Sequence, residues 1–212
     1  MTLIFPLLLV AGGVAGIAID AGAARYARRP GWSIGQTSAL VSAVIGAVGF
    51  AAAGLAPGGE LIVFSVLLAG LLLALANIDL RTFLLPDLLN AVVFGLGALM
   101  VTLLQPENWM QHAIGALAGY GVLWGLEVFY RRVRGRDGLG RGDAKLLGAI
   151  GMWTGWMGLP AVLLVASLSA ILAVVVQSAI RKEALAGQSA VAFGPWIALG
   201  GYAVWLGGLV LA

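Results

Sequence analysis

The sequence LIVFSVLLAGLLLALANI, residues 61–78, is an uninterrupted run of 18 residues without a charged side chain. As an α-helix, a run of this length can cross a hydrocarbon core roughly 30 Å thick. Charged residues begin directly after it, in Asp79-Leu80-Arg81. We therefore predict a transmembrane helix over 61–78 that carries an aspartate at its C-terminal end.

Seven further apolar runs lie on both sides of this one. Of the 212 residues, 61% are hydrophobic and 10% are charged, whereas a soluble domain has about 45–50% apolar and about 25% charged residues. Because lipid offers no water to backbone groups, helices are the expected spanning structure. The sequence thus predicts an all-α, polytopic membrane helix bundle of about eight transmembrane segments. The predicted segments are residues 2–24, 37–56, 61–78, 88–104, 113–130, 144–158, 159–179 and 190–211.

Residues 144–158 form the shortest of these runs, which joins the next run directly through Gly158-Leu159-Pro160. We predict either a short tilted span or a broken, re-entrant element. Its glycines recur at helical spacing, including Gly151-x-x-x-Gly155. Small residues on one stripe let helices approach closely in lipid, so tight packing is the expected role of these glycines.

The charges predict how the chain is oriented in the membrane. All twelve Lys and Arg residues follow the first, third, fifth or seventh segment, with Lys145 at the very start of the sixth, whereas the opposite connections carry Glu60 and Glu107. Eight crossings place these basic connections on one side, and the positive-inside rule makes that side the cytosol. We predict a multi-pass protein of the inner (plasma) membrane with both termini outside the cytosol. Basic residues placed between apolar runs indicate topology and not a nucleic-acid partner.

The residue inventory excludes several kinds of site. The chain contains no cysteine and one histidine, His112, in a predicted short external loop. Disulfides, cysteine-ligated metals and multi-histidine zinc sites are therefore excluded. We expect no metal and no cofactor. The expected surroundings of the chain are the lipid bilayer, and the residues favour no particular oligomeric state.

Two aspartates carry the functional hypothesis. Asp79 closes the third segment and Asp143 opens the sixth, so the predicted topology places both at the cytosolic face. In peptide hydrolysis one carboxylate takes a proton from water while a protonated partner polarises the scissile carbonyl, and two close carboxyls enforce that division. The alternatives are that Asp143 caps a helix N-terminus and that Asp79 pairs with Arg81. Gly140 and Gly142 favour function, since they permit close backbone approach to a substrate strand.

Other acidic residues have structural interpretations. Asp87 follows Pro86 at the start of an apolar segment, which favours an N-cap first and support of the site second. Asp20 is expected to pair with the arginines that follow the first segment. Glu127 lies four residues before Arg131, and this spacing favours an ion pair along one helix.

Three motifs resemble those of a known family. The stretch Gly140-Arg141-Gly142-Asp143-Ala144-Lys145 matches the GxGDxK pattern of prepilin peptidases, the type IV leader peptidases of the GxGD aspartyl protease group. Residues 77–87 resemble the segment of the first aspartate, and Ala192-Phe193-Gly194-Pro195 resembles the C-terminal Phe-Gly-Pro element. The resemblance implies a six-helix peptidase core over 61–212, preceded by two transmembrane helices over 1–60.

The resemblance also implies roles for residues. Asp79 and Asp143 would be the catalytic pair of an aspartyl endopeptidase that activates a water molecule. Its substrates would be prepilins or pseudopilins of type IV pili or type II secretion, which carry a short basic leader before an N-terminal apolar helix. Substrate-binding or site-supporting residues would be Gly140, Gly142, Lys145, Asp87, Phe193, Gly194 and Pro195.

The chain departs from the longer bacterial enzymes in one respect. Those carry a cytosolic loop with two CxxC pairs that is associated with N-methylation of the mature pilin. This chain has no cysteine and only about a dozen residues, Arg25–Gln36, at that place, so we expect no methyltransferase activity. Two other classes are alternatives for this sequence: a proton-coupled transporter, which would place acids nearer mid-bilayer, and a membrane scaffold without chemistry.

Overall fold

The structure, a computed structural model, describes residues 4–27, 39–134, 140–181 and 192–211, and every regular element in these ranges is a helix. Within these described residues, five helices are long and apolar enough to cross a membrane, and α2 is a shorter apolar helix. These findings confirm the predicted all-α, polytopic class. The elements are α1 (Ile4–Ala27), α2 (Ala39–Ala53), α3 (Gly59–Thr82), α4 (Asp87–Leu104), the 3-10 helix η1 (Pro106–Asn108), α5 (Trp109–Arg134), α6 (Arg141–Arg181) and α7 (Gly194–Leu211).

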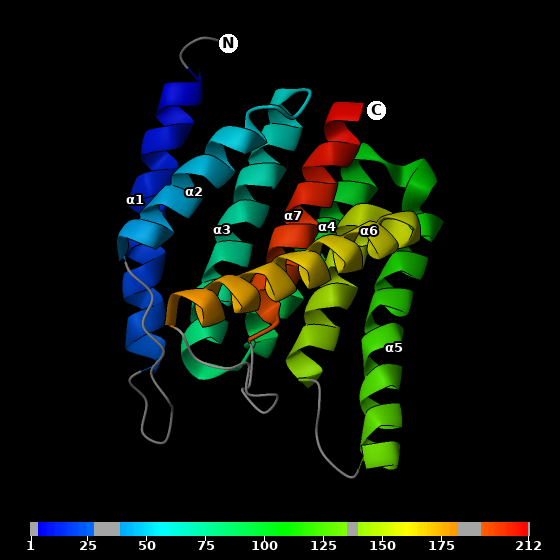
Figure 1. The fold of residues 1–212 in the computed structure, drawn as a ribbon. Helices are drawn as coiled ribbons and strands as arrows, with labels where there is room; N and C mark the ends of the chain where they lie inside the picture. Colours follow the sequence, from blue (N-terminus) through cyan, green and yellow to red (C-terminus); the bar gives the residue numbers. More distant parts are fainter. Residues whose placement is uncertain (1–3, 28–38, 135–139, 182–191, 212) are drawn as a thin grey trace.

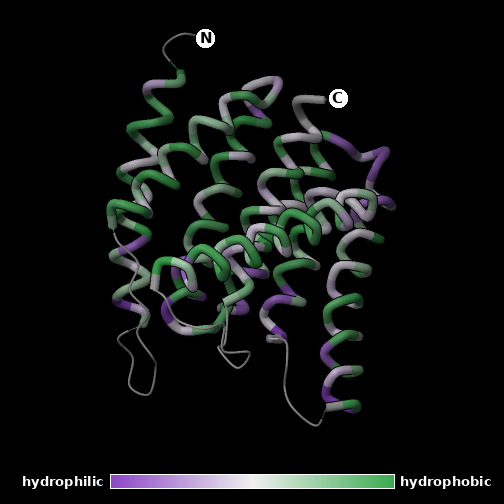
Figure 2. The backbone as a smooth tube through the Cα atoms, in the orientation of Figure 1, coloured by the Kyte–Doolittle hydropathy of each residue, from purple (hydrophilic) through white to green (hydrophobic). Residues whose placement is uncertain are grey.

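The first five α-helices run alternately down and up the bundle, and both termini lie at the same end (Figure 1). Helices α1, α3 and α5 end at the opposite end, where their last turns carry Arg25, Arg81 and Arg131. Hydrophilic residues concentrate at that end of the tube in Figure 2. Glu60 opens α3 at the end where the termini lie. The basic residues at these described helix ends therefore gather at one end of the bundle, as the topology predicts.

Helix α6 is broken at Gly155. The backbone there has φ 66° and ψ 176°, a positive-φ conformation that glycine adopts without steric cost. The part before the break runs along the bundle, and the part after it crosses the bundle obliquely (Figure 1). The predicted sixth and seventh segments therefore exist as two helices. Their junction lies three residues before Gly158, because Gly155 takes the conformation that ends the first helix.

Glycines bring two pairs of helices into backbone contact. A Cβ atom on Gly151 of α6 would lie 2.2 Å from the carbonyl oxygen of Gly115 on α5. A Cβ atom on Gly12 of α1 would lie 2.2 Å from the carbonyl oxygen of Gly46 on α2. Any larger residue would force the helices apart, so the packing role predicted for the Gly151 stripe is confirmed.

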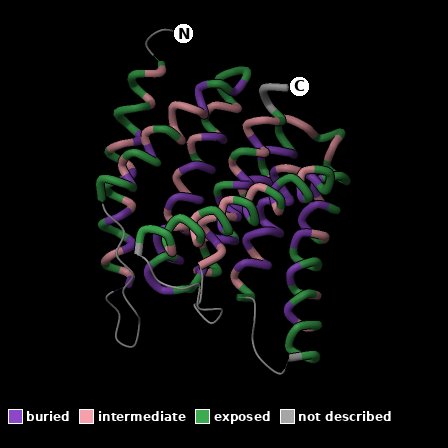
Figure 3. Tube along the Cα trace, in the orientation of Figure 1, coloured by how far each residue is buried: buried purple, intermediate pink, exposed green. Residues whose placement is uncertain are grey.

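The buried residues lie between the helices, and the exposed ones cover the outer faces (Figure 3). Trp153 of α6 is buried at the centre, where its Nε1–H donates to the carbonyl oxygen of Val93 at 2.8 Å and its ring meets Trp205 of α7 edge to face. Large apolar side chains such as Leu88 and Leu164 face outward. An apolar exterior of this kind suits contact with lipid tails.

His112 is not in an external loop as predicted. It lies inside α5, is 8% exposed, and places Nδ1 2.9 Å from the carbonyl oxygen of Met152 on α6. The helix begins earlier than its apolar run suggests, because η1 turns the chain immediately before Trp109. The histidine therefore links two helices.

Candidate active site

Asp79 lies in the last turn of α3 and is 4% exposed. The helix ends because Phe83 adopts a left-handed conformation (φ 54°) and donates its N–H to the carbonyl oxygen of Asp79 at 2.8 Å. The chain then runs extended to Pro86, which precedes the first residue of α4. This C-terminal cap holds the aspartate at the edge of a short loop, at the basic end of the bundle.

The N-terminus of α7 faces the carboxylate of Asp79. Gly194, the first residue of α7, donates its N–H to Oδ2 of Asp79 at 3.1 Å. A Cβ atom on Gly194 would lie 2.7 Å from the same oxygen, so a larger residue would displace the carboxylate. Unpaired N–H groups at a helix N-terminus stabilise negative charge. The structure thus brings Gly194 to Asp79, while Phe193 packs against the core and Pro195 lines a neighbouring cleft.

Asp143 lies in the first turn of α6 and is 9% exposed. It is not an N-cap, because α6 begins at Arg141 and the N–H of Asp143 already donates to the carbonyl oxygen of Gly140 at 3.1 Å. The backbone of Gly140 in turn hydrogen-bonds the Asp143 carboxylate. This carboxylate is close enough to that of Asp79 for their charges to repel. The two predicted catalytic groups therefore lie near each other at one end of the bundle.

Leu85 in the α3–α4 loop packs between the two aspartate-bearing regions. A Cβ atom on Gly142 would lie 2.9 Å from Cβ of Leu85, and one on Gly194 would lie 3.2 Å from its Cδ1. The side chain is 8% exposed. Leu85 thus fills the space between the start of α6 and the start of α7, directly beside the carboxyl pair.

Asp87 and Lys145 do not join the two aspartates. They form an ion pair with each other, with Nζ of Lys145 2.6 Å from Oδ1 of Asp87; the side chain of Lys145 is 40% exposed and that of Asp87 is 74% exposed. The N-cap predicted for Asp87 is wrong: Pro86 occupies that position, and no side chain caps the helix. Since the residue before α4 is a proline, Asp87 becomes its first helical residue and points toward α6.

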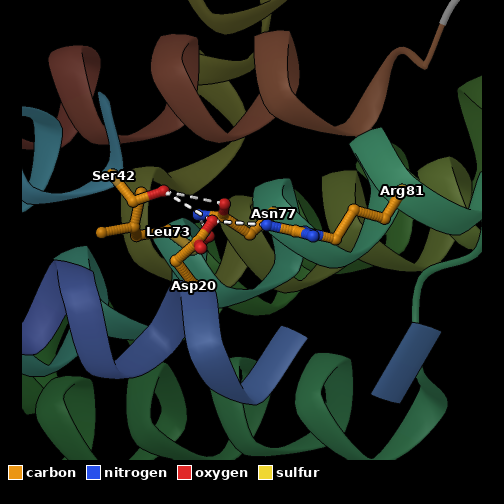
Figure 4. A network of polar contacts seen from close by, with 5 residues as sticks. All are labelled: Asp20, Ser42, Leu73, Asn77 and Arg81. Atoms are coloured by element: carbon orange, nitrogen blue, oxygen red, sulfur yellow. Dashed lines mark hydrogen bonds and ion pairs between the residues drawn. The ribbon is translucent and has the colours of Figure 1, made fainter. Parts of the chain in front are cut away.

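A buried polar network joins α3 to α1 and α2 (Figure 4). Nη2 of Arg81 on α3 lies 2.6 Å from Oδ1 of Asp20 on α1, and both side chains are nearly inaccessible. Ser42 of α2 donates to Oδ1 of Asn77 at 2.9 Å and lies 3.4 Å from Oδ1 of Asp20. The acidic partner of Arg81 is therefore Asp20, not Asp79, and three helices converge on the turn that carries Asp79.

A second charged cluster joins α5 to the start of α6. Glu127 is 3% exposed and forms the predicted ion pair with Arg131. It also lies 3.4 Å from Nε of Arg141. This contact across helices places the first turn of α6, with Asp143, against α5.

Sequence reasoning missed some of the polar residues near the aspartates. Asn77, Ser42 and Asn90 were not singled out, although each is a hydrogen-bonding side chain inside an apolar run. Such residues are costly in lipid and face the bundle interior or a cavity. All three are buried. A search for uncharged polar residues within predicted spans would have found them.

The fold and this arrangement define a polytopic helical membrane protein with two buried carboxyl groups at one end. The model of the type IV leader peptidase family matches residues 66–175, which include both aspartates, and the chain belongs to this family. No solved structure matches the chain.

Three relatives are each named prepilin leader peptidase/N-methyltransferase. The protein of Pectobacterium carotovorum is 41% identical over 160 residues, which cover 74% of this chain and 56% of the relative. The protein of Escherichia coli K12 is 40% identical over 139 residues, which cover 63% of this chain and 60% of the relative. The protein of Burkholderia pseudomallei K96243 is 36% identical over 184 residues, which cover 86% of this chain and 57% of the relative. The chain thus spans little more than half the length of these relatives.

Proposed function

We propose that this chain is an intramembrane aspartyl endopeptidase that removes the short basic leader of prepilin-like proteins at the cytosolic membrane face. The observation that carries the proposal is that Asp79 and Asp143, two buried carboxyls from separate helices, lie near each other, with Asp79 hydrogen-bonded to the N-terminus of α7. Membership of the leader peptidase family supports the substrate class. The basic helix ends around the pair support the cytosolic side.

The proposed reaction needs only the two carboxyls and water. With one proton shared between them, the ionised carboxylate takes a proton from water as the oxygen attacks the scissile carbonyl. The protonated carboxyl gives its proton to the carbonyl oxygen, which produces a tetrahedral diol. Collapse of the diol breaks the C–N bond, and a proton passes to the leaving amine. The two products are the leader with a new carboxylate and the mature protein with a free amine.

Asp79 and Asp143 suit these roles because both are buried and their charges repel each other. Two neighbouring carboxylates resist double ionisation, and they titrate as a pair. The N–H of Gly194 points at the Asp79 carboxylate, where it stabilises the single negative charge of the pair. Gly140 hydrogen-bonds the carboxylate of Asp143, and the missing side chain of Gly142 makes room for Leu85 beside the pair.

The direct test is a cleavage assay with the purified chain in lipid nanodiscs and a prepilin as substrate. We expect a shortened product, cut once between the basic leader and the apolar helix, as read by mass spectrometry. The Escherichia coli relative serves as the positive control on the same prepilin. Intact substrate in the presence of this chain, with product from the control, would contradict the proposal.

Gly194 offers a test of how closely α7 must approach Asp79. In Gly194→Ala the new methyl group would lie 2.7 Å from the carboxylate oxygen, so the carboxylate must move and its hydrogen bond must lengthen. We expect cleavage to fall by roughly tenfold or more, since one charge-assisted hydrogen bond contributes about 1.5–3 kcal/mol. Gly207→Ala on the same helix is the matched control, because nothing lies within 4 Å of its Cβ position. Equal activity of the two variants would refute the proposed contact.

Methylation is the second property to test. The relatives are named as methyltransferases as well as peptidases, but this chain contains no cysteine. We expect the mature product of this chain to carry an unmodified N-terminus when a methyl donor is present. A product heavier by one methyl group, made by the purified chain alone, would show that the cysteine pairs are not needed.

A further inference from the structure

A groove of about 730 Å³ opens between α4, α5 and the first part of α6. Its lining is mostly apolar and includes small residues from all three helices, among them Ala91, Ala113 and Gly148. Small residues allow another helix to approach closely in lipid. We refer to this feature as the α4–α5–α6 groove.

The wall of the groove contains a polar side chain without a partner. Asn90 of α4 is 4% exposed, and among the described residues neither its Oδ1 nor its Nδ2 has a hydrogen-bond partner. Buried carboxamides are nearly always satisfied, because an unmade hydrogen bond inside a protein lowers stability. An unsatisfied Asn90 in the lining of an open groove therefore points to a ligand that supplies the missing partner.

The mouth of the groove adjoins the proposed active site. Asp87 and Lys145 line the groove. Asp87 lies two residues after Leu85, which packs beside the carboxyl pair, and Lys145 lies two residues after Asp143. Asn90 lies about one helical turn further into the groove than Asp87. A segment that enters the groove thus passes Asn90 soon after it leaves the aspartates.

The chemistry of the proposed substrate matches this position. Its apolar helix begins close to the scissile bond, and the first four N–H groups of any helix have no intrahelical partner. In lipid no water is present to satisfy them. We propose that the α4–α5–α6 groove binds the first turns of the substrate's apolar helix, and that Asn90 accepts a hydrogen bond from its unpaired N–H groups. This inference rests on the proposed peptidase function.

A second cleft is the alternative binding place for the substrate helix, and it differs from the α4–α5–α6 groove. It has a volume of about 360 Å³, lies between α2, α3 and α7, and is lined by Leu80 and Pro195, which also adjoin the proposed site. Its polar lining residues Ser42 and Asn77 hydrogen-bond to each other, so this cleft presents no unpaired carboxamide like that of Asn90. The other possible occupant of the α4–α5–α6 groove is a lipid tail, which has no hydrogen-bond donor.

Cross-linking tests where the substrate helix binds. Because the chain has no cysteine, single cysteines can be placed at Ala91 in the groove, at Leu199 in the second cleft and at Leu103 on an outer face. Each is combined with Asp143→Asn, so that a prepilin carrying one cysteine in the first turns of its apolar helix stays uncleaved. We expect several-fold more disulfide product from Ala91→Cys than from the other two. A higher yield from Leu199→Cys, or equal yields from Ala91→Cys and Leu103→Cys, would overturn the proposal.

Asn90→Leu tests the hydrogen bond. Leucine has a similar size and no polar group, so we expect a higher unfolding temperature together with a roughly tenfold higher KM for prepilin and an unchanged kcat. Asn90→Gln, which keeps the carboxamide, should restore part of the affinity. A raised unfolding temperature with unchanged KM would show that Asn90 binds no substrate. Cleavage by the unmodified chain is measured in parallel, and its absence would reject the peptidase proposal itself.

Discussion

Asp79→Asn and Asp143→Asn will each abolish prepilin cleavage by the purified protein, with a loss of at least about a thousandfold, the upper range of general acid–base catalysis. An amide keeps the shape of the carboxyl group but can neither take a proton from water nor share one with its partner. Both residues are buried in a folded bundle, and the substitution removes charge from a buried position. We therefore expect both variants to be as stable as the unmodified protein.

Two further variants control for this experiment. Asp87→Asn breaks a largely exposed ion pair, worth about 0–1 kcal/mol, so we expect a much smaller loss of cleavage. Glu107→Gln changes an exposed acid in η1, far along the chain from both aspartates, and should leave the rate unchanged. Near-normal cleavage by Asp79→Asn would mean that the pair is not catalytic, and proton transport would then be the function to test.

Removing one partner of the Asp20–Arg81 ion pair should lower the free energy of unfolding by about 3–5 kcal/mol, because the remaining charge stays buried and loses its oppositely charged partner. The side chains of Arg81 and Asp20 are only 7% and 11% exposed, which is the condition for a cost of this size. The substitutions are Asp20→Leu and Arg81→Met. Unfolding by denaturant in detergent micelles, followed by circular dichroism, measures the change.

The double variant separates the ion pair from the packing around it. Apolar replacement of both partners is often neutral or stabilising, so Asp20→Leu with Arg81→Met should recover most of the lost stability. Cleavage should follow the same pattern, since Arg81 lies two residues after Asp79 in the same helix turn. A fall in the free energy of unfolding of less than about 1 kcal/mol in both single variants would mean that the Asp20–Arg81 pair is as weak as a surface ion pair. It would contradict the role of this pair in holding α3 to α1.

The sequence predicted the features that depend on local pattern. Membrane spans follow from the length of apolar runs, and the break in α6 follows from a short run ending in Gly and Pro. The position of Asp79 and Asp143 at one end follows from counting helices between them, since alternate helices return to the same side. Each of these inferences needs only residues that are neighbours in the chain.

Contacts between helices were harder to predict. The sequence did not suggest that Asp20 pairs with Arg81 on α3; of the arginines that it suggested, Arg28 lies outside the described residues. It suggested a cap for Asp87, which instead reaches Lys145 on α6. In a soluble helix the apolar face shows which side packs inward, whereas here nearly all faces are apolar. The side of a membrane helix that packs inward is therefore set by its few polar and small residues. The partners of these residues are seen only in the assembled bundle.

The backbone contacts between glycine-bearing helices have a mechanical consequence. Helices α5 and α6 touch at Gly115 and Gly151 without intervening side chains, and α1 and α2 do so at Gly12 and Gly46. The buried ion pair fastens α3 to the second of these units, and closely packed interfaces of this kind resist deformation. Each aspartate is thus carried by a different stiff block. If a substrate changes the separation of the two carboxyls, we expect one helix pair to shift against the other and neither pair to come apart.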